Sequence, residues 1–213
     1  MGTATHAAML ARRPSKRPFI ITRSTFSGAG HEVGKWLGDN VSTWKHYRNS
    51  ISGILQFSSI YQIPLVGADV CGFWGNVTSN LCARWTTLGA FYPFYRNHNS
   101  DESKAQEPYL WPIVASAARK AIAIRYPLLD YFYTAMWRQS ITGIPSLSPL
   151  FFVYPEDKKT WDMDLQYFYG PSILVAPVTH NSTEVEIYLP KGISSKPTCL
   201  SFLTPASAGS RVL

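Results

Sequence analysis

Apolar runs and helical repeats alternate along roughly the first two thirds of the chain. The stretch "RPFIITRS" (17–24) is a short apolar run rich in β-branched residues, and "IPLVGADVCGF" (63–73) is a second apolar run. Runs of this length, bounded by glycine or polar segments, are typical of buried strands. We therefore expect strands over 17–24 and 63–73, joined by a glycine-rich loop and a helix.

Segments with helical spacing follow the apolar runs. Between 42 and 60, large apolar residues recur three or four positions apart, and Ser42 or Thr43 can cap the helix. Further on, Pro127 divides a helical stretch in two. We expect helices over 42–60, within 80–94, near 112–124 and near 128–140, with a polar loop at 95–109. Repetition of strand, loop and helix predicts a parallel α/β barrel or open sheet, in which functional residues follow the C-terminal ends of strands.

The pattern changes after about residue 145. Three short apolar runs, at 148–155, 172–178 and 184–190, lie between proline and glycine turns. They predict strands of an antiparallel β domain. We divide the chain into a barrel portion (1–145), a partial β domain (146–192) and an irregular tail (193–213).

Neither portion is closed by the strands that the sequence predicts. A closed (β/α)8 barrel needs about eight strands and a β-sandwich about seven, whereas two or three strands are predicted in each portion. The fold class that we expect is therefore a partial (β/α)8 TIM barrel followed by part of an antiparallel β-sandwich. Partner chains complete this fold, or the chain is a piece of a larger protein.

The composition is that of a globular protein. Hydrophobic residues make up 46% of the 213 residues and charged residues 15%, far from a disordered composition. Aromatic residues reach 14%; they form either a large core or a surface on which a sugar ring stacks. No run of about 18 apolar residues occurs, so we expect no membrane-spanning helix, and the N-terminal pattern is not that of a secretory signal.

The net charge of +7 is concentrated near the N-terminus. Residues 1–50 hold 8 Lys or Arg and 2 acidic residues, which leaves +6, mostly from "ARRPSKRP" (11–18). Basic clusters of this kind contact nucleic acid in some proteins. Because no nucleic-acid-binding motif accompanies the cluster, we expect no nucleic-acid partner.

The cysteines and the glycosylation sequons bear on the compartment. Cys71 and Cys82 are separated by a short loop, so they form either a local disulfide or two buried thiols, and Cys199 stands apart. No zinc spacing, phosphate-binding loop or GxSxG elbow occurs, so neither a metal nor a cofactor is expected. N-glycosylation sequons begin at Asn40, Asn76 and Asn181. Together with a disulfide, they favour a secreted protein.

Two carboxylates follow predicted strands or loops where chemistry is expected. Asp39 lies in "KWLGDN", and burial beside an apolar wall such as Trp36 would raise the pKa of its carboxyl group enough for a general acid. Asp69 follows "PLVGA", where it binds a hydroxyl-rich ligand, holds Arg23 in position, or only caps a turn. Arg23 offers a fork of donors to a carboxylate or to sugar hydroxyls, and its alternative role is a surface ion pair.

Two further side chains are candidates for ligand contacts. His98, in "RNHNS", donates to a ligand or to developing charge, or is merely an exposed loop histidine. Phe73 stacks on a ring, as Trp36 also can, or packs in the core.

Long motifs closely resemble the α-glucosidases of glycoside hydrolase family 31, especially the fungal secreted enzymes. They are "RPFIITRSTFSGAG", "KWLGDN", "ILQFSSIYQIPLVGADVCGFWGN", "LCARWTTLGAFYPFYRNHNS" and "QEPY", in the order of the family. The later "YGPSILVAPV" and "EIYLPKG" resemble the start of that family's proximal C-terminal β domain. The resemblance covers roughly residues 5–192.

The resemblance implies a (β/α)8 barrel and a retaining two-carboxylate mechanism on terminal α-linked glucose. Asp39 matches the general acid/base, and the pair Cys71 and Cys82 matches a disulfide near the sugar pocket. The residues that match the lining of that pocket are Arg23, Trp36, Asp69, Phe73 and His98.

One part of the family pattern does not occur in these 213 residues. The family's nucleophile is an Asp in a Trp-Ile-Asp-Met-Asn-Glu-type motif upstream of the strand that carries Arg23, and no such motif is present. We therefore expect a fragment of an extracellular α-glucosidase that cleaves terminal α-1,4-linked glucose from maltose or malto-oligosaccharides with retention, completed by the missing N-terminal half. The alternative is a non-catalytic carbohydrate-binding or pseudoenzyme remnant.

Overall fold

A computed structural model describes residues 1–191, so the predicted tail (193–213) and Cys199 lie outside the described residues. The helices are α1 (Gly2–Arg12), α2 (Trp44–Leu55), α3 (Ser79–Gly89), α4 (Pro112–Arg125), α5 (Leu129–Thr142) and α6 (Leu150–Val153). The strands are β1 (Ile21–Thr22), β2 (Gly34–Trp36), β3 (Val66–Gly67), β4 (Asp69–Val70), β5 (Arg96–Asn97), β6 (Leu147–Pro149), β7 (Tyr167–Tyr169) and β8 (Ile173–Val175).

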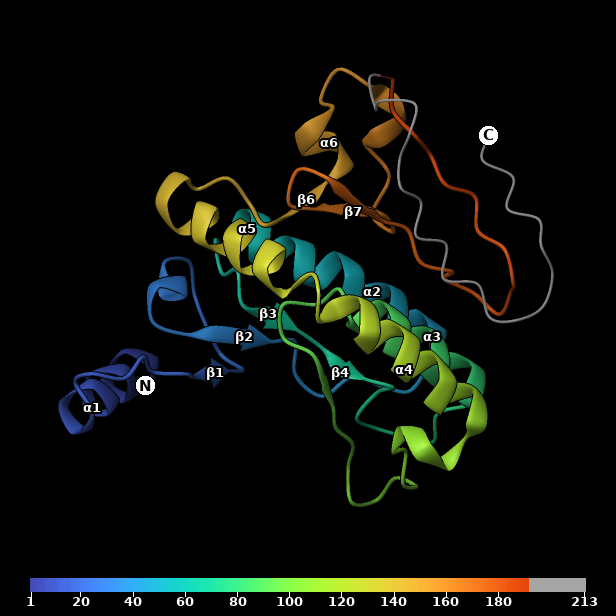
Figure 1. Cartoon of the computed structure of the whole chain (residues 1–213), viewed down its shortest axis with the longest axis horizontal. Coiled ribbons are helices and arrows are strands. Elements are labelled where there is room, and N and C mark those ends of the chain that lie inside the picture. The colour runs from blue at the N-terminus through green and yellow to red at the C-terminus, as the bar shows by residue number, and fades with distance from the viewer. Residues whose placement is uncertain (192–213) are drawn as a thin grey trace.

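The first five strands pair in parallel, as the barrel prediction requires. β1, β2 and β3 form one sheet in that order, and β4 pairs with β5. Helices α2 to α5 lie together on one side of these strands (Figure 1). The expected partial (β/α)8 barrel is therefore present, although the ladders are shorter than the apolar runs at 17–24 and 63–73.

Three elements of the barrel portion were not predicted from the sequence. Helix α1 buries none of its side chains, so its sequence has no apolar stripe to reveal it. β2 lies inside the glycine-rich stretch that we assigned to a loop, and β5 lies inside the expected polar loop at 95–109. Both strands are only two or three residues long, and their pairing comes from neighbours distant in sequence.

Helix α2 shows how the sequence builds the outer layer. The Thr43 hydroxyl caps it by accepting a hydrogen bond from the His46 backbone N–H at 3.3 Å. Its buried face includes Tyr47, Ile51 and Ile54, whose spacing places them on one stripe. The helix then continues as a π-helical turn at Gln56–Ile60, so the predicted helical segment 42–60 is found with a change of pitch near its end.

The core lies between the strands and this helical layer. Trp85 of α3 is fully buried and meets the Tyr47 ring edge-to-face at 5.5 Å. Val66 and Val70 of the strands are buried in the same cluster. Truncating a buried tryptophan of this kind costs about 3–5 kcal/mol of folding free energy. Because the helices and strands share this core, the helical layer helps to hold the strands in position.

The C-terminal portion is an antiparallel sheet of β6, β7 and β8 beyond the helical layer (Figure 1). It corrects two predictions. The run at 148–155 is mostly the short helix α6, and only its start belongs to β6. The run at 184–190 forms no ladder within residues 1–191; instead, the Gln166 amide pairs with the Tyr188 backbone, donating to its carbonyl at 2.8 Å and accepting from its N–H at 3.1 Å.

Arginines from the barrel helices hold the two portions together. Arg48 of α2 donates to the Thr179 carbonyl at 3.0 Å, and Arg84 of α3 donates to the Ser182 carbonyl at 2.9 Å. Charge-assisted bonds to backbone carbonyls are stronger than neutral ones. The loop at 179–182 is therefore tied to the same helices that support the strands.

Candidate active site

The C-terminal ends of the parallel strands bring the predicted site residues into one region. Arg23 directly follows β1, Asp39 lies three residues after β2, and His98 directly follows β5. Trp36 is the last residue of β2, and Phe73 lies three residues after β4. This is the edge at which barrel enzymes place their chemistry.

Asp39 lies on an exposed turn and pairs with Arg23. Arg23 Nη1 is 3.7 Å from Asp39 Oδ2, and the two side chains are 61% and 30% exposed. Gly38 has φ +86°, and a Cβ there would lie 3.0 Å from Arg23 Nε, so a glycine lets the arginine lie over this turn. The expected burial of Asp39 beside Trp36 is therefore wrong, because the turn carries the carboxylate out past the strand end.

Asp69 is fully buried and is held by an arginine other than the one expected. Arg96 Nη2 donates to Asp69 Oδ1, while Oδ2 has no hydrogen-bond partner in the described part of the chain. Burial raises the pKa of the Asp69 carboxyl group, and the bond and charge of Arg96 oppose that rise. The proximity of His98 lowers the same pKa and that of Asp39 raises it, so all these groups share one electrostatic environment.

Arg96 is a site residue that the sequence analysis missed. It lies on β5 directly opposite Asp69 in the parallel register. Its guanidinium carbon also lies 5.6 Å from the Trp36 ring centroid and 5.2 Å from that of Phe94, which are cation–π distances. The available signal was its position two residues before His98 in "RNHNS", which places both residues near the C-terminal end of the same strand.

Aromatic rings form another part of the region. The Phe73 and His98 rings are tilted with centroids 5.1 Å apart, and the Trp74 ring meets Phe73 edge-to-face at 4.9 Å. Trp74 is 41% exposed. Phe73 is thus partly buried beside an imidazole and is not a member of the buried core.

A disulfide fixes the turn between Asp69 and Phe73. Cys71 and Cys82 are bonded, as the resemblance implies, with Cα atoms 4.6 Å apart and both side chains buried. Cys82 belongs to the first turns of α3. The alternative of two buried thiols is therefore wrong, and the turn between Asp69 and Phe73 is linked covalently to the helical layer.

The three sequons lie in different environments. Asn40 is 8% exposed, and its amide donates to the Asp69 carbonyl at 3.0 Å and accepts from the Phe73 N–H at 2.9 Å. A glycan on that nitrogen is incompatible with this arrangement, so we withdraw Asn40 as a glycosylation site. Asn76 and Asn181 are exposed and stay predictions.

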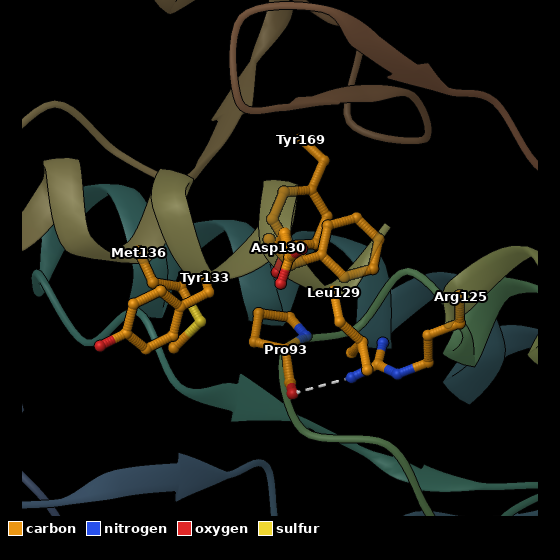
Figure 2. Close-up of a pocket in the computed structure, with 8 residues that line it drawn as sticks. Pro93, Arg125, Leu129, Asp130, Tyr133, Met136 and Tyr169 are labelled. Atoms are coloured by element: carbon orange, nitrogen blue, oxygen red, sulfur yellow. Dashed lines mark hydrogen bonds between the residues drawn. The ribbon is translucent and has the colours of Figure 1, made fainter. Parts of the chain in front are cut away.

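A separate pocket lies between α5, β7 and the loop before β5 (Figure 2). Its volume is about 330 Å³, and Arg125 lines it while donating to the Pro93 carbonyl at 3.3 Å. None of the predicted site residues lines this pocket. Its lining residues are Pro93, Arg125, Leu129, Asp130, Phe132, Tyr133, Met136 and Tyr169.

Neither a metal-binding cluster nor a membrane-spanning helix occurs within residues 1–191. That part of the chain contains no group of three His, Cys, Asp or Glu side chains arranged to hold a metal ion. None of its helices is long and apolar enough to cross a membrane.

Known proteins resemble this chain along most of its length. The alpha/beta-glucosidase agdC of Aspergillus clavatus, whose function is assigned as probable, is 59% identical over 194 residues, which are 91% of this chain and 22% of that protein. A probable alpha-glucosidase of rice is 47% identical over 190 residues, 89% of this chain and 21% of that protein. The chain therefore spans about a fifth of the length of these relatives.

Solved structures share its fold. A crystal structure of the glucosidase II alpha subunit superposes with a TM-score of 0.83 at 37% identity, over 89% of this chain and 21% of that one. The Flavobacterium johnsoniae GH31 dextranase superposes with a TM-score of 0.83 at 29% identity, over 90% of this chain and 25% of that one. Residues 1–135 match the TIM-barrel domain of glycosyl hydrolases family 31, and residues 143–198 match that family's C-terminal domain. The chain therefore belongs to glycoside hydrolase family 31.

Proposed function

We propose that this chain provides the acid/base side of an α-glucosidase active site, with Asp39 as the general acid/base. The observation that carries the proposal is the placement of Asp39: a carboxylate 30% exposed, beside Arg23, at the C-terminal ends of parallel barrel strands. It is accessible to a substrate, whereas the neighbouring Asp69 is fully buried and bound to Arg96. Retaining hydrolysis requires a second carboxylate about 5 Å away as nucleophile, and we assign that group to a part of the enzyme beyond these 213 residues.

The remaining predicted residues line the pocket for the non-reducing glucose. Within residues 1–191, Asp69 Oδ2 is buried without a hydrogen-bond partner, so it accepts a hydrogen bond from a sugar hydroxyl only once the side chains that cover it move aside. Arg23 and His98 donate to the sugar, and the faces of Trp36 and Phe73 bound it. Buried polar groups of this kind discriminate strongly between ligands, because a ligand that fails to pair them leaves them unsatisfied.

In the first step Asp39 protonates the glycosidic oxygen as it leaves, and in the second step it removes a proton from the attacking water. The substrate class that we propose is terminal α-1,4-linked glucose in maltose and malto-oligosaccharides, cleaved with retention. The names of the relatives support a glucosidase, while one neighbour is a dextranase. Linkage preference is therefore the part of the proposal that requires the most direct test.

Two further assignments belong to the same proposal. We place the division between barrel and β domain near residue 145, close to the start of the second matched family domain at residue 143. We also propose that the enzyme is extracellular. Its buried disulfide and its exposed sequons at Asn76 and Asn181 support this location.

The test uses a chimera in which this chain replaces the aligned part of the Aspergillus clavatus relative. Asp39→Asn should lower maltose hydrolysis by about 10²–10⁴-fold, the usual contribution of a general acid. Formation of the glucosyl-enzyme from an aryl glucoside with a good leaving group should be slowed far less, since that leaving group needs no proton. Azide, which needs no base, should restore turnover of the aryl substrate and give the α-configured glucosyl azide. Near-normal maltose activity in Asp39→Asn would refute the assignment.

A non-catalytic carbohydrate-binding role is the second candidate. It is favoured by the commitment of Asp69 to Arg96, which leaves Asp39 as the accessible member of the two candidate carboxylates. The same chimera separates the two functions. A folded chimera that binds glucose yet hydrolyses neither maltose nor an aryl glucoside would support the binding role.

A further inference from the structure

We propose that Asn40 is a positioning residue that sets the place of Asp39 relative to the sugar-binding turn at 69–74. This inference rests on the proposed role of Asp39. Asn40 does not contact the reacting atoms in the proposal; it acts through its covalent neighbour. Nothing in the sequence pattern distinguishes it from an ordinary sequon asparagine.

Four hydrogen bonds join Asn40 to that turn. Its side-chain amide donates to the Asp69 carbonyl at 3.0 Å and accepts from the Phe73 N–H at 2.9 Å. Its backbone carbonyl accepts from the N–H groups of Phe73 at 2.9 Å and Trp74 at 2.8 Å. Asn40 is 8% exposed, so these bonds are shielded from water. The Phe73 N–H is shared between the side-chain and backbone oxygens of Asn40, and the Asp69 carbonyl also accepts from the Gly72 N–H at 3.2 Å, so replacing the Asn40 side chain loosens the link to the turn without leaving either group unpaired.

The loop that carries Asp39 is otherwise attached at its two ends, by bonds from the Leu37 N–H to the Gly67 carbonyl at 3.0 Å and from the Ser42 N–H to the Trp74 carbonyl at 2.9 Å. On one side of Asp39 is Gly38, in the left-handed conformation at φ +86°, which adds no side chain to hold the loop. The ion pair with Arg23 is 3.7 Å long, with the arginine 61% exposed. Exposed pairs of this kind hold a side chain only weakly, because water screens their charges. Asn40 is therefore the buried anchor that fixes where the Asp39 carboxylate stands.

The anchor also joins two functions of the site. Asp69 and Phe73, the residues whose backbone Asn40 binds, are proposed sugar-pocket residues at the two ends of the disulfide-linked turn. A single buried amide thus holds the acid/base loop and the sugar-binding turn in one register. Misplacement of a catalytic group by 1 Å can cost about 10²-fold in rate, so loss of this register should slow the step that needs Asp39.

The test compares two substrates in one preparation of the chimera. Asn40→Asp keeps the size and one acceptor but places an oxygen opposite the Asp69 carbonyl, and Asn40→Leu removes both side-chain bonds. We expect kcat/KM for maltose to fall about 10²-fold and that for an aryl glucoside with a good leaving group to fall less than about tenfold. Because the ratio of the two values is independent of the folded fraction, simple destabilisation leaves it unchanged.

Matched controls separate the anchor from its alternatives. Ser42→Ala abolishes the sequon while keeping Asn40, and Asn99→Asp makes the same chemical change at an amide that donates to the Lys104 carbonyl at 2.8 Å. Both should keep the parental ratio, whereas Asn40→Asp and Asn40→Leu should lower it.

The outcomes distinguish this inference from the proposed function. If Asp39→Asn shows the substrate-dependent loss and the Asn40 variants lower both substrates equally, the positioning role is overturned while the function stands. If Asp39→Asn itself shows no such dependence, the proposed function fails first. If neither Asn40 variant yields folded protein, Asn40 serves stability and the positioning role is also overturned.

Discussion

Arg96 is the only hydrogen-bond partner of the Asp69 side chain within residues 1–191. The substitution Arg96→Met therefore leaves the buried Asp69 carboxylate without a hydrogen-bond partner or a neutralising charge there. Asp69 is 0% exposed, and its Oδ2 already lacks a partner. The substitution keeps most of the apolar stem of the arginine and removes the charge. We expect the folded state to lose stability because the carboxylate then stands alone in a medium of low polarity.

The size of the loss follows from the exposure of the two partners. Removing one member of a buried ion pair costs about 3–5 kcal/mol. The Arg96 side chain is 36% exposed, so solvent screens part of its interaction, and we expect the lower end, about 3 kcal/mol at pH 7. The double variant Asp69→Asn with Arg96→Met should recover at least about 1 kcal/mol, because no charge then remains buried.

The loss should depend on pH in a defined direction. Burial raises the pKa of Asp69 above its unfolded value, so the folded state holds more protons between the two values. The associated stability is complete below the unfolded pKa, about 3.9, and falls as pH rises through the folded pKa. Because Arg96 opposes the shift, removing it widens this window. The difference between parent and variant should therefore shrink as the pH is lowered.

Urea unfolding of the chimera, followed by tryptophan fluorescence at pH 7 and near pH 4, measures these terms. Arg96→Lys, which keeps a positive charge, is the matched control and should lose less than Arg96→Met. A defect that is the same at both pH values would show that the loss is one of packing. So would a double variant no more stable than Arg96→Met, and either result would refute the electrostatic explanation.

Three other predictions concern the whole chain. Mass mapping of non-reduced peptides should find Cys71 bonded to Cys82; the separation of 11 residues gives a stabilisation of about 2.8 kcal/mol in the loop-entropy description, and a free Cys71 would contradict it. In a secreting yeast, glycopeptide analysis should find Asn76 and Asn181 occupied and Asn40 unmodified, whereas a glycan on Asn40 of folded protein would overturn its placement. The isolated 213-residue chain should be poorly soluble and inactive, because its strand edges and many large apolar side chains are exposed; enzyme-like release of glucose from maltose would contradict this.

The elements that the sequence predicted well are those with a local pattern. Helix α2 carries a cap and an apolar stripe, and α4 and α5 meet at Pro127, so their positions are encoded within a few turns. The strands β2 and β5 have no such pattern. Lys35 in the middle of β2 is buried, donates to the Arg23 carbonyl and lies 4.9 Å from the Phe57 ring centroid. From the sequence alone, such a lysine indicates an exposed loop, because the groups that it contacts when buried lie elsewhere in the chain.

The C-terminal portion shows the opposite error, in which a local pattern suggested structure that does not form. The run at 184–190 alternates as a strand does, but a strand requires a neighbouring backbone to complete its hydrogen bonds. Here the Gln166 side chain satisfies the Tyr188 backbone in place of a neighbouring strand. In the run at 148–155, Pro149 ends the pairing with β7, and the following apolar residues turn into α6.

The site residues also fall into two groups: those that can be recognised by their own chemistry, and those that hold them in place. Asp39, Asp69, Arg23 and His98 were identified because their chemistry and their position after apolar runs or glycine turns indicate a strand-end site. Their partners were not, since Arg96 lies 27 residues from Asp69 and Asn40 lies 33 residues from Phe73. Only the parallel pairing of β4 with β5 and the closing of the loop after β2 bring them together. Sequence motifs therefore point to the candidate groups for substrate contact, whereas the residues that set their geometry emerge from the fold.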